Sequence, residues 1–71
     1  MAWVETPDSS NIARFDYDAA TKVLSVQFRS GGVYTYSGVQ KRVFTQMKAA
    51  SSVGKFFEAR IKGVYEYSRI G

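Results

Sequence analysis

The chain has 71 residues, which is enough for one domain and excludes a second one. Ten Lys and Arg residues outnumber six Asp and Glu residues, and the net charge of +4 favours contact with polyanions such as nucleic acid. The sequence shows neither a secretory signal nor the roughly 20 consecutive apolar residues that cross a bilayer, so we expect a cytoplasmic protein without membrane contact.

Residues 1–8 read as an N-terminal leader, because a cluster of turn formers, residues 7–11, precedes the first strand pattern. Residues 9–71 then form the single domain. Polar and apolar residues alternate in residues 12–17, which predicts a strand with Phe15 and Tyr17 on one face and Arg14 on the other. The same alternation assigns Ala13 to the face of Phe15 and Ile12 to the face of Arg14.

Residues 22–29 predict a second strand, with Leu24, Val26 and Phe28 on its buried face. The connection from the first strand is expected to be a four-residue turn, residues 18–21, which would place Phe15 opposite Leu24. Two glycines follow the second strand and predict a hairpin into a third strand, residues 33–37, because glycine adopts the positive φ of tight turns.

The hydrophobic period changes after Gly38 and predicts a helix that ends near Ala50. Ser51 and Ser52 offer an N-cap to a second helix, residues 53–62, which Gly63 can end. Residues 64–70 alternate again and predict a short extended tail. The expected fold is α+β, with a three-stranded antiparallel sheet followed by two helices packed on one face.

The chain has no His and no Cys, which removes the commonest general base, thiolate nucleophiles and the best transition-metal ligands. We therefore expect a non-catalytic binding module without cofactor or metal. Asp16 and Asp18 could form a two-carboxylate site for a hard cation, but an Asp18 that bonds its own backbone in a turn explains the pattern better. A phosphate contact by Ser52 and Lys55 is the alternative to a purely capping role at the second helix.

The orientation of Tyr34 and Tyr36 depends on the length of one hairpin loop, since a shift of one residue moves every side chain to the opposite face. A two-residue loop, 30–31 or 31–32, places both tyrosines on the outer face with Gln27 and Arg29. A three-residue loop, 30–32, turns both rings into the core. Two-residue glycine turns are the commoner solution and favour the outward orientation.

With the rings outward, the sheet would present stacking rings and cationic groups, a surface typical of proteins that bind single-stranded RNA. The predicted nucleic-acid-binding residues are Tyr34, Tyr36, Arg14, Gln27, Arg29, Lys41 and Arg42. RNA is preferred over DNA, and a monomer or weak homodimer is expected. The alternative function is a protein-interaction or small regulatory module that docks through the same aromatic face.

The order of several short motifs along nearly the whole chain resembles the KTSC domain family, named for the C-terminal domain of some lysyl-tRNA synthetases. The segments that resemble it are residues 9–12, 17–18, 24–28, 32–36, 39, 54–57 and 61–65, and the typical central Tyr-x-Tyr is Tyr34 and Tyr36. The family usually has Pro at the start of the following helix, where this chain has Gln40. The resemblance implies this family's fold and a proposed role in RNA binding.

Overall fold

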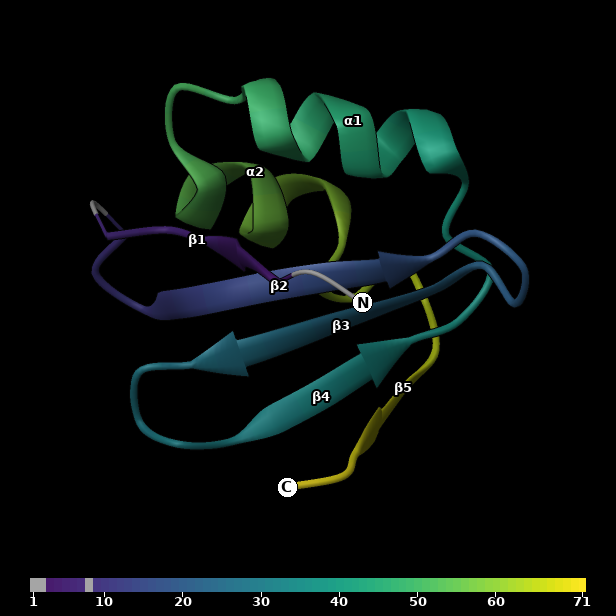
Figure 1. The fold of residues 1–71 in the computed structure, drawn as a ribbon, viewed down its shortest axis with the longest axis horizontal. Helices are drawn as coiled ribbons and strands as arrows, with labels where there is room; N and C mark the ends of the chain where they lie inside the picture. The colour runs from purple at the N-terminus through teal and green to yellow at the C-terminus, as the bar shows by residue number, and fades with distance from the viewer. Residues whose placement is uncertain (1–2, 8) are drawn as a thin grey trace.

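The computed structural model describes residues 3–7 and 9–71, and it shows two helices lying across one face of an antiparallel sheet (Figure 1). The elements in chain order are β1 (Val4–Glu5), β2 (Ile12–Asp18), β3 (Val23–Phe28), β4 (Val33–Tyr36), α1 (Lys41–Ala49), α2 (Val53–Arg60) and β5 (Tyr67–Arg69). The strands lie in the spatial order β1-β2-β3-β4-β5, so that β5 returns from the helices to pair with β4.

The expected α+β class, with an antiparallel sheet and two helices, is confirmed. The expected number of strands is wrong, because the sheet has five strands and not three. β1 forms from residues of the predicted leader and pairs with β2, whereas β5 forms from the predicted tail. Residues 1–2 and 8 of that leader lie outside the described residues.

β2 departs from simple alternation because a β-bulge interrupts its pairing with β3 between Ile12 and Arg14. Ala13 is the extra residue, since Ile12 pairs with Phe28 and Arg14 pairs with Gln27. The bulge turns Ile12 to the helix side together with Phe15, which corrects the face that strict alternation assigned to Ile12. The β2–β3 loop also starts one residue later than expected, so Phe15 lies opposite Val26.

The β3–β4 hairpin has a three-residue loop, Arg29 to Gly31, because the Phe28 N–H donates to the Gly32 carbonyl at 2.9 Å. Gly31 adopts a φ of 106°, which L residues rarely reach. In this register Tyr34 pairs with Val26 and Tyr36 with Leu24. The outward orientation of the two tyrosines is therefore wrong. The inward orientation that a three-residue loop implies is correct, although the loop covers residues 29–31 and not 30–32.

The core fills the space between the sheet and the helices. Its buried residues are Ile12, Phe15, Leu24, Val26, Tyr36, Val39, Met47, Phe57 and Ile61. Phe44 of α1 packs edge-on against Phe15 and stacks on Tyr17, with ring centroids 5.7 and 5.1 Å apart. The Tyr17 hydroxyl donates to the Val39 carbonyl at 2.5 Å and so ties β2 to the chain just before α1.

α1 begins at Lys41 with Gln40 as its N-cap residue, and the Gln40 side chain makes no capping hydrogen bond. α2 has the cap that the sequence predicted, because the Ser52 hydroxyl accepts a hydrogen bond from the Lys55 N–H at 3.3 Å. Each helix is shorter than its predicted counterpart. Within the described residues, no helix has the length and apolar character needed to span a membrane.

Candidate functional site

Five aromatic side chains line a cavity of about 360 Å³ between α2 and the sheet. These rings, which we call the aromatic pocket, are Phe28, Tyr34, Tyr36, Phe57 and Tyr67. The sheet supplies all of them except Phe57, which projects from α2. Opposite residues of antiparallel strands share a face, and the pairs Tyr36 with Leu24 and Tyr36 with Tyr67 therefore direct the tyrosines to the helix side.

The five rings make a closed circuit of contacts around this cavity. Phe57 lies 5.4 Å from both Phe28 and Tyr36, measured between ring centroids and at nearly perpendicular angles. Tyr67 lies 5.9 Å from both Tyr34 and Tyr36 in tilted arrangements. Phe28 and Tyr34 close the circuit at 5.5 Å. The edge-to-face contacts stabilise the packing of Phe28 and Phe57 against their neighbours, and an aromatic π face can bind a further ring or a cation.

Exposure differs strongly around the circuit. Tyr36 is only 5% exposed, whereas Tyr67 at the sheet edge is 64% exposed. Burial raises the pKa of Tyr36 above its ordinary value of 10, and the neighbouring Tyr34 and Tyr67 hydroxyls raise it further. The floor of the pocket is therefore a buried, neutral ring, and its most accessible aromatic surface lies on the side of β5.

Charged and polar groups surround the mouth of the pocket. Lys62 and Glu58, at and just beyond the C-terminal part of α2, line the cavity together with Asn11. On β5 the Arg69 guanidinium lies 5.9 Å from the centre of the Tyr34 ring. Lys62 and Glu58 thus place one charge of each sign at the cavity, and Arg69 adds a cation beside the Tyr34 ring.

The predicted binding residues do not form one surface. Tyr34 and Tyr36 lie in the aromatic pocket, whereas Arg14 and Gln27 lie on the opposite, outer face of the sheet. There the Arg14 Nε donates to Gln27 Oε1 at 2.5 Å, and the Arg14 guanidinium lies 4.5 Å from the Trp3 ring centre. The sheet itself separates the predicted stacking rings from these two polar residues.

Arg29 has a structural role that the sequence did not predict. Its Nε donates to the Ser9 carbonyl at 2.7 Å, and one terminal nitrogen donates to the carbonyls of Thr6 and Pro7 at 2.7 and 3.2 Å. The guanidinium therefore fastens the segment that connects β1 to β2. Lys41 and Arg42 are exposed in the first turn of α1, outside the residues that line the pocket.

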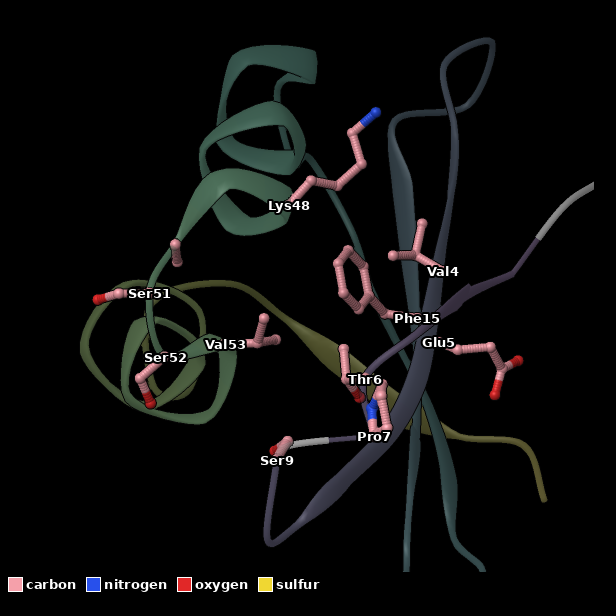
Figure 2. A pocket seen from close by; sticks show the side chains of 11 residues that line it. Val4, Glu5, Thr6, Pro7, Ser9, Phe15, Lys48, Ser51, Ser52 and Val53 are labelled. Atoms are coloured by element: carbon pink, nitrogen blue, oxygen red, sulfur yellow. The ribbon is translucent and has the colours of Figure 1, made fainter.

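The two residues of the second predicted site, Ser52 and Lys55, do not line one cavity either. Ser52 caps α2 and borders a separate cavity of about 240 Å³, which Lys48 and not Lys55 helps to line. Figure 2 shows this cavity between the strands with Val4 and Phe15 and the helix ends with Lys48 and Val53. The capping role of Ser52 is confirmed, and a phosphate contact by this pair stays a prediction.

The two aspartates of the alternative metal site have separate environments. Asp18 Oδ1 accepts hydrogen bonds from the N–H groups of Ala20 and Thr21 at 2.9 and 3.4 Å, as expected for a turn. Asp16 is 5% exposed and accepts a hydrogen bond from the Tyr17 N–H at 2.8 Å. Within the described part of the chain, no three acidic side chains gather in a way that could hold a metal ion.

Sequence reasoning missed Phe57, Lys62, Tyr67 and Arg69 as neighbours of Tyr34 and Tyr36. The alternation in residues 64–70 predicted an extended segment but not its partner strand. Had that segment been paired with the third strand, Tyr67 and Arg69 would have come to the face of the central tyrosines.

Comparison with known proteins agrees with this architecture. The model of the KTSC domain family matches residues 8–67. The chain belongs to the KTSC domain family. The crystal structure of a KTSC domain protein from Yersinia pestis is 36% identical and superposes with a TM-score of 0.92, covering 99% of this chain and 97% of that one.

Relatives show the KTSC domain both within larger proteins and as most of a small one. Lysine–tRNA ligases from Trichormus variabilis and Nostoc punctiforme are each 34% identical to this chain over 64 residues, or 90% of its length. This chain spans 11% of each of those ligases. A protein from Stutzerimonas stutzeri is 35% identical over 63 residues, covering 87% of this chain and 89% of its own length.

Proposed function

We propose that this KTSC domain is a non-catalytic module that binds single-stranded RNA by receiving a base in the aromatic pocket. The observation behind the proposal is the 64% exposed Tyr67 ring, which lies beside Tyr34 over a cavity of about 360 Å³. Stacking of bases on aromatic rings is the usual way in which proteins hold single strands, and each stacked base contributes about 1–3 kcal/mol.

The charges near the pocket favour a nucleic acid as the ligand. Lys62 lines the pocket, Arg69 lies 5.9 Å from the centre of the Tyr34 ring, and the chain has a net charge of +4. A base inserted between β5 and α2 would bring its neighbouring phosphates toward these two cations. The residues proposed to bind RNA are therefore Tyr34, Tyr67, Lys62 and Arg69, with Tyr36 as the buried floor.

The relatives give separate support. Proteins that are similar to this chain over 90% of its length are lysine–tRNA ligases, which by name act on a tRNA. A domain attached to such an enzyme has an RNA close at hand. Because this chain matches only 11% of those ligases, their ligase activity is not part of the proposal.

Titration of a fluorescent single-stranded RNA, followed by anisotropy, tests the proposal. Tyr67→Ala removes an exposed ring and should leave the domain folded, while it weakens binding by about 1–3 kcal/mol. Arg69→Ala should flatten the slope of log affinity against log salt concentration by about 0.7, the contribution of one phosphate contact to a single strand.

Arg14→Ala is the matched control, because it removes a cation from the opposite face of the sheet. We expect it to leave both the affinity and the salt slope unchanged. If Arg14→Ala weakens binding and Tyr67→Ala does not, the outer face is the RNA surface and the proposed pocket is wrong. If the folded wild-type domain does not bind RNA at all, the proposal fails.

A protein partner is the second candidate. Val64, Tyr67 and Ile70 are large apolar side chains that are more than 60% exposed, and all three lie in the last eight residues. Large apolar side chains that are exposed to solvent often mark protein contacts. If the domain binds a protein through this segment and does not bind RNA, this second candidate is favoured.

A further inference from the structure

One edge of the sheet lies along β5, and the backbone groups of this strand alternate in direction. The Glu66 carbonyl accepts from the Ser37 N–H at 2.9 Å, and the Ile70 N–H donates to the Val33 carbonyl at 2.8 Å. Since bonding groups of an antiparallel strand recur every second residue, Tyr67 and Arg69 direct their N–H and C=O groups away from β4. In the described chain, no strand lies on that side.

We propose that the chain forms a dimer through β5. In this dimer β5 pairs antiparallel with β5 of a second copy, about a two-fold axis at Ser68. In this register Tyr67 of each copy lies opposite Arg69 of the other. The outward N–H of each residue meets the outward carbonyl of its counterpart, so four backbone hydrogen bonds form. The two sheets become one continuous sheet, with the helices of both copies on the same face.

The side chains make a second copy the occupant that this edge fits. Tyr67 and Arg69 both lie on the helix side of the sheet, since they pair with Tyr36 and Tyr34. Arg69 already lies 5.9 Å from the Tyr34 ring centre. In the proposed pairing its other side receives Tyr67 of the second copy, and the two-fold axis repeats this cation–π contact. Charged side chains on an edge strand usually prevent pairing with another strand, but here the charged Arg69 would contact the Tyr67 ring of the second copy.

Oxidative cross-linking of Ser68→Cys tests this register. Ser68 would face its own counterpart as a non-hydrogen-bonded pair with a Cα–Cα distance of about 4.5 Å, which a disulfide can span. The chain has no native Cys, so the new thiol is the only one. Ser51→Cys, at an exposed serine between α1 and α2, is the control. We expect a cross-linked dimer from Ser68→Cys and much less from Ser51→Cys, whereas equal yields would overturn the register.

Sedimentation velocity over a range of protein concentrations tests the backbone bonds. Arg69→Pro removes an outward N–H and keeps the bonds between β4 and β5, because the Arg69 N–H does not face β4. Two lost hydrogen bonds per dimer should weaken self-association by roughly 25-fold. Arg69→Ala keeps the N–H and should weaken it less.

The edge proposal is contradicted if wild-type protein stays monomeric at every concentration, or if Arg69→Pro associates as the wild type does. Circular dichroism checks that Arg69→Pro is folded, and if it is not, the cross-linking of Ser68→Cys decides alone. These measurements contain no RNA, so their outcome is separate from that of the RNA titration.

Discussion

Tyr36 lies directly opposite Leu24 in the β3–β4 ladder, and this single pairing places the Tyr-x-Tyr motif on the helix side of the sheet. Tyr36 is buried there against Phe57, and the less buried Tyr34 lies beside Phe28. The motif therefore has two roles within one pocket. Tyr36 belongs to the core, and Tyr34 belongs to the accessible wall.

Burial of Tyr36 predicts a loss of stability in alkaline solution. Its folded-state pKa is raised above 10 by burial and by the nearby Tyr34 and Tyr67 hydroxyls. Below the unfolded-state pKa both states hold the proton and stability is unaffected. As pH rises past the unfolded-state pKa, the unfolded state ionises first and its free energy falls, so the folded state loses relative stability through the range up to its raised pKa. Urea unfolding of Tyr36→Phe should show a smaller loss than the wild type over the same pH range.

Truncation of the two phenylalanines of the β2–β3 pair should have different costs. Phe15 is 0% exposed, and its removal leaves a cavity under α1. We expect Phe15→Ala to lower the free energy of unfolding by about 3–5 kcal/mol. Phe28 is only partly buried at the aromatic pocket, so Phe28→Ala should cost no more than about 3 kcal/mol, the low end of that range. Chemical denaturation measures both, and a larger cost for Phe28 would contradict this placement of the core.

Loss of the Arg29 guanidinium should loosen the chain between β1 and β2. In Arg29→Ala, hydrogen exchange should become faster at the amides of Thr6 and Ser9, which hold this segment through bonds to Ala13 and Thr6. The salt slope of RNA binding should stay at its wild-type value, because the guanidinium is already engaged by backbone carbonyls. A flatter slope in a variant with unchanged exchange would instead make Arg29 a phosphate contact.

Gly54 should resist substitution although it lies in a helix. Ala is better than Gly in a helix by about 1 kcal/mol, but a Cβ at position 54 would lie 2.8 Å from the Asn11 Oδ1 atom. The Ser9 hydroxyl donates to that same oxygen at 3.1 Å and holds it in place. We expect Gly54→Ala to destabilise the wild type and to stabilise an Asn11→Ala background. A double-mutant cycle by urea unfolding measures the difference, and additive effects would mean that the two sites do not touch.

The sequence predicted the elements that have a clear hydrophobic period. The alternation in residues 22–29 and the Ser52 cap both correspond to elements of the structure. Ile12 was assigned to the wrong face because a one-residue bulge cannot be seen in an alternating pattern. β1 was missed and β5 was predicted only as an extended tail, because each strand has only two or three residues and takes its stability from the neighbouring strand.

The candidate site depended on long-range pairing that local patterns do not contain. Tyr34 and Tyr36 were identified from their spacing, but their face depended on whether the loop before them had two or three residues. Tyr67 and Arg69 reach the same face only because β5, which follows both helices in the chain, pairs with β4. Arg29 resembled a phosphate ligand because its three carbonyl partners lie about 20 residues away in the sequence.

NMR mapping of single-stranded RNA onto the labelled domain tests the central claim most directly. The account predicts that ring signals of Tyr34 and Tyr67 and amide signals of β5 shift on titration, while the Trp3 indole and the Arg14 amide on the outer face do not. Shifts confined to Trp3, Arg14 and Gln27, with the aromatic pocket unchanged, would contradict the account and return the binding surface to the outer face of the sheet.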